Sequence, residues 1–397
     1  MRAFQAMCIG ATSLAIFGSC HPIEEEEALD YIVVFRDHVA SDPVKRDLHS
    51  NWMSEMSANS TANFAIGKLA GYHGSFTKRQ IKAIRDHEDV AYVEEDSYDF
   101  GQNVTFVQHT PPWGLARISH REKPNTNGDT GDSYVFDQVA GDGTTIYLLD
   151  TGIRDSHAEF TGRVRWGKNF VTQEGNDDRN GHGTHVAGTA AGAAVGVAKY
   201  AEIVPVKILD SQQRGRLSDF VKALEWVVDD HKSKGGRSIV NYSAVGEVSQ
   251  SRDDAIASVL DEGLIFVGAA GNNESDACDY GPPNYTENNG DKAQLIVAGL
   301  NFTDAPADFT NYGRCVQIYA PGVNINSSVN TGDTAYEIMS GTSMAAPHVA
   351  GLASYYWSIY PDYDAKAITD MIKNSNPGSV VNNFPGTSNG IAYNGAN

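Results

Sequence analysis

Basic residues are scarce in this chain. It has 30 Lys and Arg residues against 50 Asp and Glu residues, which gives a formal net charge of −20 at pH 7. Because phosphate binding needs a concentrated basic patch, this balance argues against a nucleic-acid partner. After the first twenty residues the sequence also lacks an apolar run long enough to span a bilayer, so no membrane span is predicted.

Cysteine is scarce as well, with four residues in a chain of 397. Residues 1–20 combine one positive charge, a short apolar stretch and small residues, which predicts a secretory signal peptide and an extracellular location. Cys8 and Cys20 fall within this segment. Cys278 and Cys315 remain, and an oxidising compartment favours a disulfide between them.

The rest of the chain is predicted to form two folded units. The first has the order β-α-β-β-α-β, which is typical of a small α+β ferredoxin-like domain. Its expected elements are a strand over 30–39, a helix over 42–58, two short strands within 63–76, a helix over 77–90 with Thr77 as N-cap, and a strand over 90–100. Residues 101–112 are polar and contain proline, so they are predicted to be a linker.

The second unit begins near Trp113. Short β-branched runs alternate there with helical patterns, which predicts an α/β fold with a parallel sheet covered by helices on both faces. The expected strands are 144–150, 201–210, 237–244, 264–272 and 294–300, and the expected helices are 217–231, 251–263 and 343–360. In this architecture, functional groups collect at the carboxyl ends of the strands.

The segment "RNGHGTHVAGTAAG", residues 179–192, holds His182 and His185 between glycines. Three roles are open for such histidines: packing, metal binding, or action as a catalytic base. The usual zinc motifs add a glutamate or spaced cysteines, and neither is found here. A catalytic base needs a nucleophile and an orienting carboxylate elsewhere in the chain.

Asp150 and Ser343 can supply those two groups. Asp150 ends the expected strand 144–150, and Ser343 lies at the start of an expected helix, where backbone N–H groups support negative charge. Each residue alone could be an ordinary turn or cap residue. Together with His182 they follow the Asp-His-Ser chain order of subtilisin. His185 and His348 are predicted to be packed in the interior.

The segments "YLLDTGI", "NGHGTHVAGT" and "SGTSMAAPHVAGLA" resemble the three signature blocks of subtilisin-like serine proteases. "PWGLARIS" and the spacing of the blocks are most similar to the proteinase K branch. The first unit resembles the inhibitory propeptide of such enzymes, notably in "YIVVFRD" and "VAYVEED". The resemblance implies a parallel, doubly wound subtilisin-like sheet preceded by an α+β prodomain. It divides the chain into a signal peptide (1–20), a propeptide (21–105) and a peptidase domain (106–397).

The resemblance also implies the roles of the site residues. Ser343 would be the nucleophile, His182 the general base and then acid, and Asp150 the group that orients His182. The Asn272 side chain and the Ser343 backbone N–H would form the oxyanion hole.

The implied substrate-binding residues form two walls of the primary pocket and part of a second binding strand. They are Ser243, Ala244, Val245 and Gly246, then Ala269, Ala270 and Gly271, and finally Gly215. The segment "NYSAVG" differs from the Ser-Leu-Gly-Gly pattern that the family usually has. If the register has no gap, Val245 replaces a glycine, which predicts a shallower pocket that prefers small or medium apolar residues. A one-residue bulge that points Val245 away is the open alternative.

No cofactor is expected for catalysis. The resemblance implies a structural calcium site, but Gln317 stands where the family has a carboxylate, so that site is doubtful and no other calcium ligand is assigned. Cys278 and Cys315 match a disulfide of some members of the branch.

The predicted function is that of a secreted serine endopeptidase made as a self-processing zymogen. Its expected partners are protein and peptide substrates and its own propeptide, acting as inhibitor and folding aid, and the chain is expected to be a monomer. Two alternatives stay open. One is a non-catalytic binding protein that processes itself once and keeps its propeptide. The other is a kexin-like protease, although "NYSAVG" and "GAAGN" lack the acidic residues that its pocket needs.

Overall fold

The computed structural model describes residues 28–56, 58, 60, 62–96, 105–124, 128–289, 292–375 and 378–396. The predicted signal peptide, residues 1–20, lies outside the described residues. The chain divides into two compact units, Met1–Gly101 and Gln102–Asn397, which places the division four residues before the predicted domain boundary.

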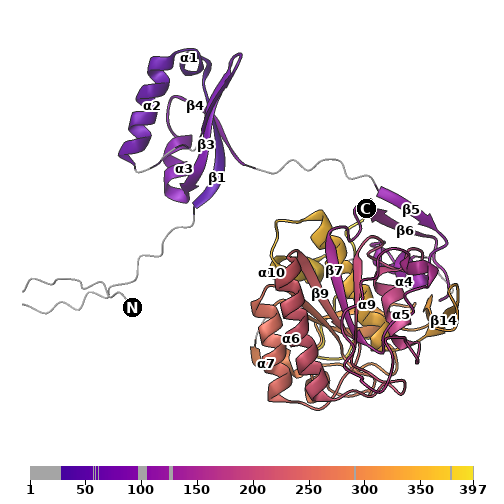
Figure 1. Cartoon of the computed structure of the whole chain (residues 1–397). Coiled ribbons are helices and arrows are strands. Elements are labelled where there is room, and N and C mark those ends of the chain that lie inside the picture. Colours follow the sequence, from indigo (N-terminus) through magenta and orange to yellow (C-terminus); the bar gives the residue numbers. More distant parts are fainter. Residues whose placement is uncertain are drawn as a thin grey trace, which may run out of the picture. The chain divides into compact units, whose positions relative to one another are not determined.

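The first unit is a four-stranded antiparallel sheet with helices, in the strand order β2-β3-β1-β4 (Figure 1). Its elements are β1 (Ala28–Phe35), α1 (Asp37–Ala40), α2 (Pro43–Glu55), β2 (Ala62–Ile66), β3 (Leu69–Thr77), α3 (Lys78–Arg85) and β4 (Val90–Glu95). The predicted order of strands and helices is confirmed. The first strand is shorter than predicted, because α1 begins directly after it.

Local sequence signals explain where the helices of this unit begin. The Thr77 hydroxyl accepts a hydrogen bond from the Gln80 backbone N–H, and the Gln80 side-chain oxygen accepts one from the Thr77 backbone N–H, so the predicted cap is a complete capping box. Asp42 caps α2, with Pro43 in the first turn. The helices bury an apolar core whose members include Val33 and Ile84.

The second unit contains a six-stranded parallel sheet, a two-stranded ribbon and a two-stranded hairpin. Its strands are β5 (Thr105–His109), β6 (Ser133–Asp137), β7 (Thr144–Asp150), β8 (Glu202–Lys207), β9 (Arg237–Tyr242), β10 (Ile265–Ala269), β11 (Gln294–Leu300), β12 (Ile318–Pro321), β13 (Ile325–Ser328) and β14 (Tyr336–Met339). Its helices are α4 (Trp113–Ile118), α5 (His182–Ala191), α6 (Leu217–Lys234), α7 (Gln250–Asp261), α8 (Asn284–Asn289), α9 (Thr342–Ile359) and α10 (Ala365–Asn374).

The sheet has the order β12-β11-β10-β9-β7-β8, and every neighbouring pair is parallel. Figure 1 shows β7 and β9 between α6 and α7 on one side and α9 and α5 on the other. The helix α9 contacts most strands of the sheet and is buried along nearly its whole length. The predicted parallel sheet with helices on both faces is therefore confirmed. No helix among the described residues is long and apolar enough to cross a membrane.

The sequence patterns did not predict α4, α8, α10, β6, β13 or β14. Two further parts of this unit also differ from the sequence-based expectation. The segment 101–112 was predicted to be a linker, but Thr105–His109 forms β5, which pairs antiparallel with β6. β12 adds a sixth strand to the five that were predicted. Both strands are only four or five residues long, and β12 is buried on both faces, so neither shows an alternation that the sequence alone could reveal.

The structure joins Cys278 to Cys315 in a disulfide with a Cα–Cα distance of 5.4 Å. The bond closes a loop across 37 residues of chain. Cys315 is fully buried in a small apolar cluster with Ala277 and Ile296, so the crosslink ties the segment after β10 to the sheet near β11 and β12.

Candidate active site

Asp150 and His182 meet at the carboxyl edge of the sheet. Asp150 is the last residue of β7, and His182 is the first residue of α5. The Nδ1 atom of His182 lies 2.8 Å from the Asp150 Oδ1 atom, and both side chains are at least nine-tenths buried. Since the carboxylate can only accept, His182 Nδ1 carries the proton and its Nε2 atom is left as a base.

Asp178 fixes the loop that leads to His182, and sequence reasoning missed it. One carboxylate oxygen accepts from the backbone N–H groups of Asn180 and Gly181, and the other accepts from Thr184. Thr151 donates its hydroxyl to the same carboxylate. Asp178 therefore couples the start of α5 to the residue that follows Asp150. Its position four residues before His182, at a helix start, was the only signal available in the sequence.

The electrostatics of the pair favour a protonated His182. Burial is the largest single cause and lowers the pKa of this imidazole, but the charge and the hydrogen bond of Asp150 together with the charge of Asp178 outweigh it. The net pKa is raised above its ordinary value of 6.5. The two carboxylates therefore stabilise the imidazolium that forms when His182 accepts a proton.

Ser343 is the second residue of α9 and lines the same cavity as His182. Its hydroxyl donates to the backbone carbonyl of Ser243 at 2.9 Å. In return, the Ser243 hydroxyl donates to the Ser343 carbonyl at 3.0 Å. These two bonds tie the segment after β9 to the first turn of α9, and they hold the Ser343 hydroxyl on Ser243 rather than on His182.

Asn272 has its amide orientation fixed by its neighbour. Its Oδ1 atom accepts from both the backbone N–H and the hydroxyl of Thr342, each at 2.9 Å. The Nδ2 group is then the donor end that remains for the cavity, which Asn272 lines beside Ser343. A side-chain N–H and the N–H groups at the start of α9 are therefore placed near one another.

The cavity has a volume of about 210 Å³. Of the predicted substrate-binding residues, it is lined by Ser243, Ala244, Val245, Ala269 and Gly271. Sequence reasoning missed four further lining residues, Leu209, Gln213, Asn273 and Thr342. None of these four belongs to a predicted pocket wall, so their place depends on the packing of separate loops.

Val245 reaches across the gap between the two walls. A Cβ atom built on Gly271 would lie 3.6 Å from Cγ1 of Val245, which is van der Waals contact. Directly after Val245 the chain leaves the wall, because Gly246 exchanges two backbone hydrogen bonds with Gly281. The Val245 side chain therefore lies on the cavity lining close to Gly271 of the opposite wall.

The backbone conformation and the packing at position 271 both require glycine. Its φ of +104° belongs to the left-handed region, and an added Cβ would lie 2.4 Å from the Asn311 Nδ2 atom. Asn311 is fully buried and donates to the Ala270 carbonyl, and its Oδ1 atom accepts from the Asn273 N–H. Asn311 thus holds this wall from behind, a role that nothing in its local sequence indicated.

Three predicted substrate-binding residues, Gly215, Gly246 and Ala270, do not line the 210 Å³ cavity. Ala270 is fully buried, and Gly215 lies instead along a separate cavity of about 810 Å³. This larger cavity is rimmed by Arg214, Arg216 and Lys222 together with Asp210 and Glu174. Lys168 and Asp219 line it too, so four cations and three carboxylates give it a mixed, slightly positive lining.

The other singled-out residues have structural contacts. His185 Nε2 donates to the backbone carbonyls of Ile325 and Glu337, and burial lowers its pKa to about 4. Burial likewise lowers the pKa of His348 to about 4. The Gln317 Oε1 atom accepts from the Ile296 N–H at 2.6 Å, so this amide is engaged with β11.

Comparison with known families gives two matches along the chain. The profile of the subtilase family, Peptidase S8, matches residues 141–393, which include all three residues of the Asp-His-Ser set. The profile of peptidase inhibitor I9 matches residues 30–98, which coincide with the first unit.

Individual relatives and one solved structure agree with these matches. The chain is 37% identical to a subtilisin-like serine protease, Pen ch 18, of Penicillium rubens, over 92% of this chain and 80% of the relative. It is 36% identical to alkaline protease 2 of Aspergillus fumigatus, over 92% of this chain and 81% of the relative. A cold-adapted subtilisin-like serine proteinase superposes with a TM-score of 0.66 at 34% identity, covering 72% of this chain and all of that one. The chain therefore belongs to the subtilase family and is a subtilisin-like serine protease preceded by an I9 inhibitor segment.

Proposed function

We propose that the protein is a secreted endopeptidase that uses Asp150, His182 and Ser343 and frees itself from its own inhibitor segment. The observation that carries the proposal is the 2.8 Å contact between His182 and Asp150, with Ser343 lining the same cavity. Export is supported by the predicted signal peptide and by the disulfide between Cys278 and Cys315.

The reaction would begin with a rotation of the Ser343 side chain from the Ser243 carbonyl toward His182. Ser343 Oγ attacks the substrate carbonyl carbon while its proton passes to His182 Nε2. Asp150 stabilises the resulting imidazolium through Nδ1. The negative oxygen of the tetrahedral intermediate accepts from Asn272 Nδ2 and from the Ser343 N–H.

The intermediate collapses when the C–N bond of the substrate breaks. His182 then gives its proton to the leaving amine, and the acyl group stays on Ser343. A water molecule, deprotonated by His182, repeats the attack and releases the acid product. No cofactor enters this scheme.

The first unit would inhibit the peptidase unit until it is cut off. This role is supported by the match to peptidase inhibitor I9. Residues 105–107 are held in β5, where they pair with β6. We place the processing site within residues 97–104, which lie outside the described residues.

The decisive variant is Ser343→Ala. We expect it to abolish both peptide hydrolysis and removal of the first unit, since one nucleophile serves both reactions, and to leave only a residual rate from binding and the oxyanion hole. Ser340→Ala is the matched control, because Ser340 is exposed and its hydroxyl accepts from the Asn324 backbone outside the triad.

Both variants are expressed as full chains, and the mass of each product and its repeated turnover of a peptide substrate are measured. Isolated Ser343→Ala precursor that still matures would refute self-processing. A mature wild-type protein that hydrolyses no more than one peptide per molecule would instead favour the non-catalytic alternative.

A further inference from the structure

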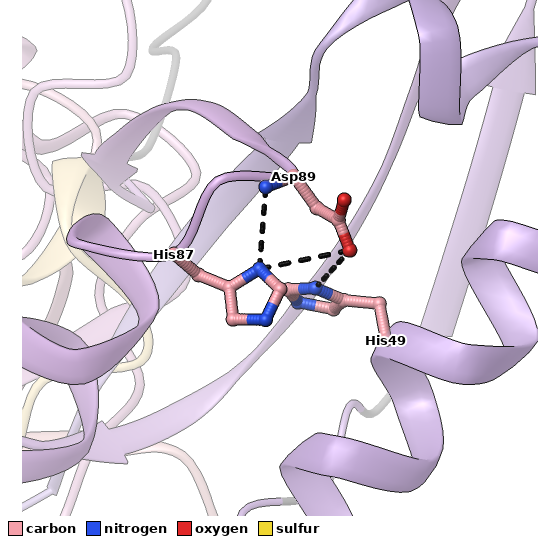
Figure 2. A group of neighbouring side chains, drawn as sticks. All are labelled: His49, His87 and Asp89. Atoms are coloured by element: carbon pink, nitrogen blue, oxygen red, sulfur yellow. Dashed lines mark hydrogen bonds and ion pairs between the residues drawn. The ribbon is translucent and has the colours of Figure 1, made fainter.

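Three ligand-type side chains of the inhibitor segment converge on one point (Figure 2). His49 comes from α2, while His87 and Asp89 come from the turn between α3 and β4. One ligand atom from each residue lies within 4.8 Å of the other two. Within the stretches that the structure describes, this is the one group of three or more His, Cys, Asp or Glu side chains with that geometry.

The separations in this group suit a shared cation better than a hydrogen bond. The Asp89 Oδ2 atom lies 3.4 Å from His49 Nδ1 and 3.6 Å from His87 Nδ1. Both distances are long for an N–H···O bond, which is ordinarily about 2.9–3.0 Å. Ligands about 2.0–2.2 Å from a tetrahedral ion are roughly 3.3–3.6 Å apart, so the two contacts of Asp89 have the spacing of ligands around one ion.

His49 presents a buried nitrogen to the group. The residue is only 1% exposed, and within the described structure its Nδ1 atom has no hydrogen-bond partner. The opposite ring nitrogen, Nε2, lies 3.1 Å from the Tyr72 hydroxyl. When Nε2–H donates to that oxygen, the Nδ1 lone pair is free and faces the Asp89 carboxylate, an arrangement that a cation between them stabilises.

Aromatic packing fixes the orientation of both imidazoles. The His49 ring packs edge-on against Phe35 and His87, with centroid distances of 5.1 and 4.6 Å. Trp52 lies 4.1 Å from the His87 ring and 5.2 Å from the His49 ring.

Metal binding would also carry identifiable costs. The Asp89 backbone N–H donates to His87 Nδ1 at 3.2 Å, and an ion at that nitrogen would replace this bond. Lys45 lines the adjoining cavity of about 390 Å³ and adds an unfavourable positive charge, which Glu88 on the same lining offsets. This cavity gives room for a water molecule as the fourth ligand.

We propose that His49, His87 and Asp89 form a binding site for a divalent transition-metal ion of the Zn²⁺ type in the inhibitor segment. Two imidazoles and one carboxylate are ligands that Zn²⁺ and Co²⁺ accept, whereas Ca²⁺ and Mg²⁺ favour oxygen ligands. An ion there crosslinks α2 to the turn before β4 and stabilises the folded inhibitor segment.

The site is tested on the full precursor carrying Ser343→Ala and no histidine tag, so that the first unit stays attached. After chelator treatment and dialysis, the protein is titrated with ZnCl₂ by calorimetry and with CoCl₂ by visible absorption. We expect about one ion per chain and the intense d–d bands of a tetrahedral Co²⁺ site.

Two variants and one control locate the ion. His87→Gln and Asp89→Asn change side chains at the partly exposed edge of the group and should each lose that ion or weaken its binding at least ~10-fold. His73→Gln, a half-buried histidine of β3 outside the group, should bind as the parent does. The far-ultraviolet circular dichroism of each variant checks that it is folded.

The proposal is overturned if the parent binds neither ion, or if folded His87→Gln and Asp89→Asn bind as tightly as the control. The second outcome would place the ion elsewhere, for example at His182. None of these readouts depends on protease activity, so they separate this proposal from the proposed function.

Discussion

At the level of single residues, we predict that Val245 shapes the primary pocket. Its Cγ1 atom lies at contact distance from the position of a Gly271 side chain, so it narrows the space between the walls. We expect Val245→Gly to raise kcat/KM for peptides with Phe before the scissile bond, relative to Ala, by at least ~10-fold. Profiling wild type and variant with one peptide library measures this ratio.

Ala244→Gly is the matched control, because Ala244 lines the same wall without a branched side chain. It should leave the Phe-to-Ala ratio within a few-fold of wild type. If wild type and Val245→Gly prefer large aromatic residues equally, Val245 points away from bound substrate and the bulge alternative holds.

The pH dependence of hydrolysis follows from His182. Its pKa is raised above 6.5 by Asp150 and Asp178, and a protonated His182 cannot accept the Ser343 proton. Activity should therefore be complete above the raised pKa and be lost as the pH falls through it. The acid limb of kcat/KM is expected to have its midpoint above 6.5, the ordinary value of histidine.

A profile of kcat/KM against pH, taken with an uncharged peptide, measures this midpoint. Asp150→Asn removes the main cause of the rise, so its limb should move to lower pH while kcat falls by about 10⁴-fold. A wild-type midpoint at or below 6.5 would show that burial outweighs the two carboxylates.

At the level of elements, the wall that follows β10 depends on one glycine. Gly271→Ala places a Cβ atom 2.4 Å from Asn311 Nδ2 and also strains a backbone with φ of +104°. We expect it to lower kcat/KM by ~10-fold or more, because small misplacements at an active site are costly. The strained backbone alone destabilises the fold by about 1–2 kcal/mol.

Gly263→Ala, in the loop before β10, separates the two effects. Its φ is +82°, but an added Cβ meets nothing within 4 Å. It should lower the melting temperature through backbone strain alone and leave kcat/KM unchanged. Equal losses of activity in the two variants would mean that Asn311 does not position the wall.

The elements that the sequence predicted well have signals within their own residues. β7 was predicted to its last residue because it is a compact run rich in β-branched and apolar residues. The start of α9 was predicted to within one residue, because Gly341 precedes it and Thr342 and Ser343 open it. The hydrogen-bond partners of Asp178 could not be predicted from the sequence, although this residue lies four positions before His182. The role of Asn311 could not be predicted either, because it packs against Gly271, which lies forty residues earlier in the chain.

At the scale of the whole molecule, the bond between Cys278 and Cys315 is the one disulfide among the described residues. A bond that closes a 37-residue loop stabilises the fold by roughly 3–4 kcal/mol in the chain-entropy account. We expect the Cys278→Ser, Cys315→Ser double variant to melt several degrees lower than its parent. Both are compared in a Ser343→Ala background, which prevents self-digestion.

Thiol labelling checks the same bond directly. Mature wild-type protein, denatured without reductant, should react at no cysteine, and with reductant at two. Two labelled thiols in the unreduced sample would contradict the crosslink, whatever the melting temperatures.

The pairing of β5 with β6 has a consequence for the lifetime of the enzyme after activation. A cut between 97 and 104 breaks no hydrogen-bonded pair of the described strands, since β4 ends at Glu95 and β5 begins at Thr105. The new amino terminus is then followed at once by a strand held by five cross-strand partners. Exopeptidases need an unpaired chain end, and at most a few residues would precede the paired strand. If the precursor is cut between 97 and 104, the pairing of β5 with β6 should therefore slow exopeptidase digestion from the new amino terminus.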